Sequence, residues 1–304
     1  MTTTPRQPVP TTQVDPFTGR PVLVAPGRRL RPMQTLDDNG GGPCPFCPGN
    51  EAMTPPEVDS VRHGDALPPG PGWVVRAFGN LYPAAAAHEV IAEGDTHATR
   101  PAALDVGLWR DALALYRRRI AAMEARVACA FLFKNVGYRA GASIAHNHTQ
   151  LLGLDAPTPR LAQALARLSG RRPCPLAEDV ARAEAEGRVV FHNARYVVHC
   201  PRVPKLPFET WLSPRDPGDD FLAPVDDLAL AEALHAAFVA LDAGLDAPPF
   251  NAYLLRDRDR RLPWHFELQP RTGNLAGLEL GGDMYINSVP PAEAAARLRR
   301  LGPD

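Results

Sequence analysis

The 304-residue sequence has few cysteines, almost no excess of charge and no long apolar run. Its five cysteines are an odd number, and no charged start with an apolar centre marks a secretion signal, so a disulfide framework is not expected. The formal net charge of −1 offers no basic surface for nucleic acid or for an acidic membrane. No apolar stretch approaches the roughly 20 residues that span a bilayer. We therefore expect a cytoplasmic protein with neither nucleic acid nor a membrane as its partner.

Apolar residues make up 45% of the chain and charged residues 22%, which is enough for a packed core. The length suits one large or two ordinary domains. The 34 prolines gather in connecting segments, which indicates long ordered loops between short strands.

The same order of elements occurs twice along the chain. Apolar residues three and four apart predict helices, and short apolar runs predict strands. The predicted elements are 73–78, 89–93, 104–127 (helix), 128–135, 160–168 (helix), 188–190, 196–198, 228–241 (helix), 251–256 and 292–300 (helix). Cys-Pro-Leu at 174–176 also repeats the pattern of Cys-Pro-Phe at 44–46. We predict an α+β fold of two related units, residues 1–157 and 173–304, that share one pseudo-symmetric sheet.

The strongest functional signal is His-x-His-x-Gln at His146, His148 and Gln150. Side chains two residues apart in a strand share one face, so these groups would point the same way. Residues 137–143, just before them, include two glycines and several small residues, which permits close approach of a ligand. The alternative is a strand whose histidines alternate by chance. Two partly desolvated imidazoles need partners, however, so we favour a functional site.

Cys44 and Cys47 are spaced Cys-x-x-Cys, so both thiolates can reach one metal ion from a single turn. A redox pair is the alternative, but this motif opens a loop and does not begin a helix after a strand. His97 and His146 are candidates for the other two ligands, and His88 is a rival to His97. Two sulfur and two nitrogen ligands suit zinc, and four protein ligands would make the site structural.

If His146 binds a metal, His148 remains beside the small-residue loop and faces Arg28 and Arg31. An imidazole near cationic or amide donors suits attack on phosphorus, which would form a phosphoramidate. Such a reaction depends on positioning and on neutralising phosphate oxygens more than on proton transfer. The arginines could equally be solvated surface charge. Uncharged donors for the oxygens are Gln150, Ser143 and Asn135.

Several motifs, taken in order, resemble those of the galactose-1-phosphate uridylyltransferases, a family of the histidine-triad superfamily. They cover nearly the whole chain and include D-P-F-T-G-R-P-V-L-V at 15–24, R-R-L-R-P at 28–32, C-P-F-C-P-G-N-E at 44–51, H-E-V-I at 88–91, D-T-H at 95–97 and F-K-N-x-G…G-A-S…H-N-H-T-Q at 133–150. The resemblance implies two histidine-triad-like halves in a mostly antiparallel sheet flanked by helices.

The resemblance also implies roles for particular residues. His148 would be the nucleotidylated histidine and Gln150 its phosphate-side partner. One zinc ion would be bound by Cys44, Cys47, His97 and His146, which sets His88 aside. Substrate contacts would come from Arg28, Arg31, Asn135 and Ser143 to phosphate and from Asn80 to the nucleoside. The family further implies ping-pong transfer of a nucleoside monophosphate, and a homodimer.

The second half departs from the family pattern. Pro263-Trp-His265 keeps only the second histidine of an H-x-H, and Cys174 has no partner at Ala177. We therefore predict that a second metal site is lost. Residues 276–287 do not match the family's hexose-binding segment. They resemble the A-G-x-E-x-G…Y-I-N stretch of the plant ADP-glucose phosphorylase and its bacterial relatives.

These observations predict a zinc-containing transferase of carbohydrate metabolism. It would move UMP from a nucleotide sugar such as UDP-glucose to a sugar 1-phosphate, as in galactose metabolism, through a nucleotidyl group on His148. One alternative is an ADP-sugar phosphorylase, which transfers the adenylyl group to phosphate. The other is a catalytically silent nucleotide-binding scaffold, which would bind nucleotide without turnover.

Overall fold

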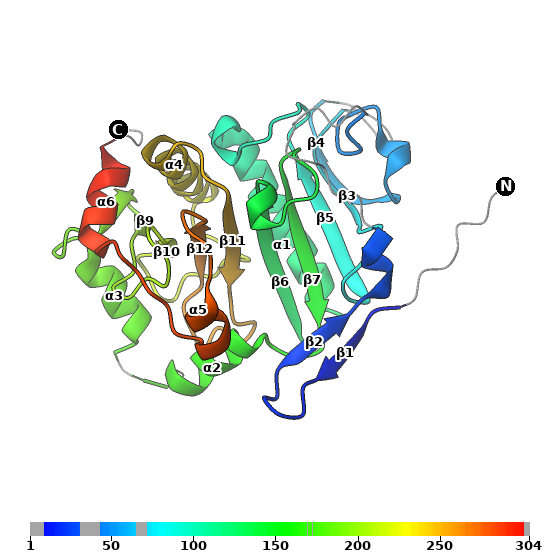
Figure 1. Ribbon diagram of the computed structural model, residues 1–304. Coiled ribbons are helices and arrows are strands. Elements are labelled where there is room, and N and C mark those ends of the chain that lie inside the picture. The colour runs from blue at the N-terminus through cyan, green and yellow to red at the C-terminus, as the bar shows by residue number, and fades with distance from the viewer. Residues whose placement is uncertain (1–8, 31–42, 65–71, 169, 172, 301–304) are drawn as a thin grey trace.

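The computed structural model describes residues 9–30, 43–64, 72–168, 170–171 and 173–300. These residues form a ten-stranded antiparallel sheet and a separate two-stranded hairpin (Figure 1). In spatial order the sheet consists of β3 (Glu57–Arg62), β4 (Trp73–Gly79), β5 (Ala87–Glu93), β7 (His148–Leu154), β6 (Cys129–Val136), β11 (Phe250–Leu255), β12 (His265–Pro270), β10 (Thr210–Pro214), β9 (Tyr196–His199) and β8 (Val189–His192). The hairpin joins β1 (Thr11–Val14) to β2 (Pro21–Val24) through a turn in which the Asp15 carboxylate accepts a hydrogen bond from the Phe17 amide.

Two long helices cover one face of the sheet and bury the main core against it. Asp105 and Asp226 cap their first turns by accepting hydrogen bonds from backbone amides. Contrary to the expectation from the sequence, the second of these helices, Asp227–Leu245, is long and apolar enough to cross a membrane, but 61% of its apolar window is buried inside the fold. The helices are α1 (Val106–Glu124), α2 (Pro159–Leu168), α3 (Pro175–Ala183), α4 (Asp227–Leu245), α5 (Gly277–Gly282) and α6 (Pro291–Arg299).

One row of directly paired residues crosses all ten strands and shows the internal symmetry of the sheet. From β3 to β8 the row reads Glu57, Phe78, Val90, Gln150, Phe133, Tyr253, Glu267, Trp211, His199 and Val189. Directly paired residues project from the same face. A pseudo-twofold axis therefore passes between Phe133 and Tyr253 and relates Gln150 to Glu267.

The predicted fold class is confirmed, since in both halves a long helix lies between the third and fourth strands along the chain, and the strands have a matching spatial order. The domain boundaries at 157 and 173 remain a prediction, and α2 lies between them. The sequence did not predict β3, α3 or α5. Charged residues interrupt the strand pattern in β3, and the three glycines in α5 are poor helix formers.

A buried polar cluster ties three neighbouring strands and a helix together. The Glu93 carboxylate on β5 accepts hydrogen bonds from Tyr116 on α1, from Lys134 on β6 and from Thr149 on β7. Lys134 Nζ also donates to the carbonyl oxygen of His148 at 3.0 Å. Each of these charged groups is at most 4% exposed, so each depends on its partners for solvation.

We expect Lys134→Met to destabilise the protein by about 3–5 kcal/mol, because it leaves the buried Glu93 carboxylate without a cation. Equilibrium unfolding in urea measures this loss. The double variant Glu93→Gln/Lys134→Met removes both charges and should lose less stability than the single variant. A single variant within about 1 kcal/mol of wild type would contradict the role given to this pair.

Candidate functional site

The break before β7 separates the two histidines of the His-x-His motif. The strand begins at His148, while His146 lies in the preceding bend. The prediction that both histidines share one strand face is therefore wrong. Asn147 lies between them. Its backbone carbonyl accepts a hydrogen bond from the Glu93 amide, and its amide donates to the Ala98 carbonyl, so the chain turns at this point. The two imidazoles consequently lie in two different environments.

Cys44, Cys47, His97 and His146 converge, with one candidate ligand atom from each lying within 4.8 Å of the others. Cys47 Sγ lies 3.2 Å from His97 Nδ1 and 3.5 Å from His146 Nδ1. A tetrahedral zinc ion with ordinary bond lengths needs ligand atoms roughly 3.3–3.8 Å apart. The Phe46 amide lies 3.4 Å from Cys44 Sγ and donates to it, which favours a thiolate there. The geometry and the donor set both fit a metal ion.

The protein environment of this cluster favours neutral groups. Burial raises the pKa of the Cys44 thiol to about 11 and lowers the pKa of His146 to about 4. A neutral imidazole is already in the form that binds metal. A dication between the four side chains would offset the cost of a thiolate, so metal binding and thiol deprotonation would be coupled.

A pocket of about 200 Å³ lies beside this cluster, on the sheet face away from α1, and His148 lines it. The Phe46 ring meets the His148 ring edge-on at 5.2 Å between centroids, so the loop between Cys44 and Cys47 also forms a wall of the pocket. His148 Nδ1 lies 2.8 Å from the carbonyl oxygen of His146 and donates to it. The proton therefore sits on Nδ1, and Nε2 carries the lone pair of the neutral ring.

Gln150 is oriented by a histidine whose role the sequence analysis did not identify. The backbone amide of Ala84 donates to Nδ1 of His88 at 2.9 Å, which leaves the proton on Nε2. That nitrogen lies 3.1 Å from Gln150 Oε1 and donates to it. The amide nitrogen of Gln150 therefore remains the donor for a ligand. His88 was considered only as a metal ligand, and its place two residues from Val90 on the same strand face could have indicated this contact.

The other predicted substrate contacts lie in the pocket lining, in the loop before His148 and at the rim of the pocket. Asn80 and Ser143 line the pocket with His148. The side-chain amide of Asn251 donates to Asn135 Oδ1 and to the Ala140 carbonyl, both at 2.8 Å, so the second half of the chain fixes the small-residue loop. In that loop Gly137 has φ +81 and its added Cβ would meet Pro249 at 3.1 Å, so glycine is required.

Arg28 lies at the rim of the pocket, where its guanidinium donates to the carbonyl oxygen of Tyr82 at 2.8 Å. Tyr82 is itself a lining residue. Arg28 is thus placed near the pocket, as a phosphate-contacting residue would be. Arg31 lies outside the described residues.

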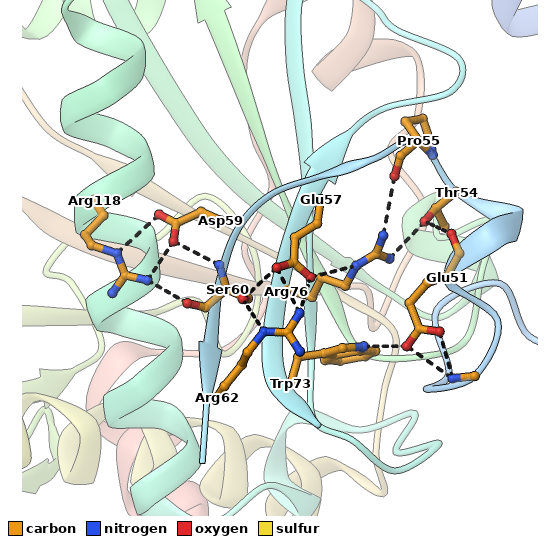
Figure 2. A network of polar contacts seen from close by, with 11 residues as sticks. Glu51, Thr54, Pro55, Glu57, Asp59, Ser60, Arg62, Trp73, Arg76 and Arg118 are labelled. Carbon is orange, nitrogen blue, oxygen red and sulfur yellow. Dashed lines mark hydrogen bonds and ion pairs between the residues drawn. The ribbon is translucent and has the colours of Figure 1, made fainter. Parts of the chain in front are cut away.

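A network of arginines and carboxylates holds the outer wall of the pocket onto β4 (Figure 2). Buried Arg76 donates to Thr54 Oγ1 at 2.8 Å and to the Pro55 carbonyl, and both of these residues line the pocket. Arg76 also pairs with Glu57 at 3.3 Å, and its guanidinium lies 4.7 Å from the centre of the Phe78 ring. The wall is therefore fixed by charged hydrogen bonds, which are stronger than neutral ones.

The chain matches one family model and two named enzymes. The model described as domain of unknown function DUF4921 matches residues 111–301. An ADP-glucose phosphorylase from Arabidopsis thaliana is 28% identical over 96% of this chain and 93% of the relative. A galactose-1-phosphate uridylyltransferase from Thermotoga maritima is 24% identical over 94% of this chain and 96% of the relative.

Solved structures agree with these matches. The crystal structure of the Arabidopsis thaliana ADP-glucose phosphorylase with bound ADP-glucose has a TM-score of 0.74 at 28% identity, covering 96% of this chain and 99% of that chain. A uridylyltransferase structure has a TM-score of 0.77 at 25% identity, covering 95% and 97%. The predicted resemblance to the galactose-1-phosphate uridylyltransferases and to ADP-glucose phosphorylase is confirmed.

We expect Cys47→Ser to lower the bound zinc from one ion per chain to near zero, because Cys47 lies centrally between both imidazoles. Elemental analysis of the purified protein measures this. At free zinc about 1,000-fold above the dissociation constant, losing the site costs about 4 kcal/mol, so the melting temperature should also fall. His88→Gln is the matched control and should keep its zinc. Full zinc occupancy in Cys47→Ser would contradict the assignment.

Proposed function

The chain belongs to the DUF4921 family, and we propose that it is a nucleotidyltransferase that carries a nucleoside monophosphate on His148. The observation that supports this most directly is the position of His148 in the lining of the pocket. Its Nδ1 donates to a backbone carbonyl, and the ring lines a cavity large enough for part of a nucleotide. The relatives named above catalyse reactions on sugar nucleotides or sugar phosphates by their names, which agrees with this chemistry.

In the proposed first step, Nε2 of His148 attacks the α-phosphorus of a nucleotide sugar. The N–P bond forms as the bond from phosphorus to the bridging oxygen breaks, and a sugar 1-phosphate leaves. In the second step an oxygen of the acceptor attacks the same phosphorus and the N–P bond breaks. The hydrogen bond from Nδ1 to the His146 carbonyl stabilises the positive charge that the imidazole acquires while it carries phosphorus.

The phosphate oxygens need donors during both steps. We propose that Gln150 donates its side-chain amide to them, since His88 occupies its carbonyl oxygen. Asn135, Ser143 and Arg28 would supply further donors, with Arg31 as predicted from the sequence. Asn80 would contact the nucleoside from the wall of the pocket.

Two nucleotides are candidates for transfer. The sequence predicts UMP, with a sugar 1-phosphate as acceptor. Adenylyl transfer from an ADP-sugar to phosphate is the second candidate. It is supported by the 28% identity to ADP-glucose phosphorylase across nearly the whole chain and by the segment 276–287.

We further propose that the ion held by Cys44, Cys47, His97 and His146 is a single structural zinc. It would fix the loop that carries Phe46 and the bend that ends at His148. The homodimer and the cytoplasmic location remain predictions from the sequence.

Incubation with UDP-glucose or ADP-glucose, followed by intact-mass analysis, tests the covalent step. Wild type should gain the mass of a UMP or AMP moiety, and the nucleotide that adds identifies the donor. The His148→Asn variant should show no adduct, and its turnover should fall by ~10³-fold or more, as when a nucleophile is removed.

His265→Asn is the matched control, because His265 lies at the position that the pseudo-twofold axis relates to His148. It should still form the adduct. Absence of an adduct with any nucleotide sugar would rule out the covalent mechanism. Nucleotide binding without turnover would favour a silent scaffold.

A further inference from the structure

A second pocket lies in the C-terminal half, where the pseudo-twofold axis would place a copy of the first. Its volume is about 300 Å³, compared with about 200 Å³ for the first. The walls match through the strand register and through the repeated Cys-Pro motif. The matching pairs of lining residues are Phe46 and Leu176, Asn80 and Pro201, Tyr82 and Val203, and Val90 and Trp211.

Trp211 forms the floor of this second pocket. Its ring stacks on His265, with 4.3 Å between centroids and 25° between planes. Its Nε1 donates to Glu209 at 2.9 Å, and His199 meets it edge-on at 6.2 Å. The indole is therefore rigid, and it covers the histidine that corresponds to His148. A ligand in this pocket meets an aromatic surface and cannot reach the imidazole.

Two exposed arginines stand among the lining residues, Arg182 and Arg202. Arg202 lies 3.5 Å from Glu186, and Arg182 forms no ion pair with any residue in the described part of the chain. The Asp179 carboxylate, which also lines the pocket, is already paired with buried Arg188 at 2.8 Å. The guanidinium of Arg182 therefore has its donors available for an anionic ligand.

We propose that the second pocket is a non-catalytic nucleotide-binding site. Trp211 would stack the base, because every base presents a flat face to an aromatic ring. Arg182 and Arg202 would hold the phosphate, and the Glu178 carboxylate would accept hydrogen bonds from the ribose hydroxyls. The volume falls at the lower end of the usual range for small-ligand pockets. The site does not depend on the reaction proposed for His148.

Equilibrium dialysis of the full chain with AMP and with UMP tests the proposal. Neither nucleotide carries a sugar phosphate that could leave, so the measurement reports binding without the reaction proposed for His148. Wild type should bind two equivalents of one of them per chain, and Trp211→Leu only one. The double variant Arg182→Gln/Arg202→Gln changes exposed residues alone and should weaken the second equivalent about tenfold.

Fluorescence identifies which pocket is filled. Trp73, Trp109 and Trp264 are 1%, 1% and 3% exposed, whereas Trp211 is partly exposed, so quenching by nucleotide should disappear in Trp211→Leu. No bound equivalent in wild type, or a single equivalent that Trp211→Leu retains, would overturn the proposal. Two equivalents in Trp211→Leu would overturn it as well. A missing adduct on His148 would refute only the function proposed for the first pocket.

Discussion

The buried contact between Glu93 and Lys134 holds the N-terminal half of the sheet in place. It joins β5, β6 and β7 at one level beneath the sheet, on the face opposite the pocket. Burial lowers the pKa of Lys134, and the nearby carboxylate opposes this shift, so the pair is stable only as a unit. Because Lys134 also donates to the carbonyl of His148, the first residue of β7 is fixed through its backbone. Its imidazole, which lines the pocket, is therefore carried by a rigid backbone.

The bend before β7 lies next to this anchor. It places His146 and His148 in different surroundings. His146 lies outside the sheet and contacts Cys47, while its carbonyl accepts the Nδ1 proton of His148. The cluster of two cysteines and two histidines therefore acts on the pocket in two ways. It positions a backbone oxygen that sets the tautomer of His148, and it positions the Phe46 ring that packs against the same imidazole.

Much of this arrangement could be predicted from local patterns. The spacing of Cys44 and Cys47 suggested a metal loop, the apolar spacing within 104–127 predicted α1, and the repeated element order predicted a pseudo-symmetric sheet. Features that depend on distant contacts could not be predicted. The bend at His146 depends on hydrogen bonds to residues on other segments, and period-two spacing alone suggested a continuous strand. The orientation of Gln150 by His88 requires the register between β5 and β7, which the sequence does not specify.

The two halves of the sheet differ at several symmetry-related positions around the histidine, and these differences depend on one another. Pro263 stands where His146 would be and offers no side-chain ligand for a metal. Glu267 replaces Gln150, and a buried carboxylate would repel a phosphate ligand. Although burial opposes it, the hydrogen bond from His265 lowers the pKa of Glu267 to about 2, and Arg160 and Lys205 add their charges nearby.

In the second half, His265 is hydrogen-bonded to the Glu267 carboxylate and does not reach the pocket. Trp211 completes the change, because an indole on the imidazole excludes any ligand from it. The corresponding residue in the first half is Val90, whose small side chain leaves His148 open to the pocket. In the proposed mechanism, the size of this one side chain, together with the amide of Gln150, determines which half of the sheet can bring a phosphorus atom to its histidine.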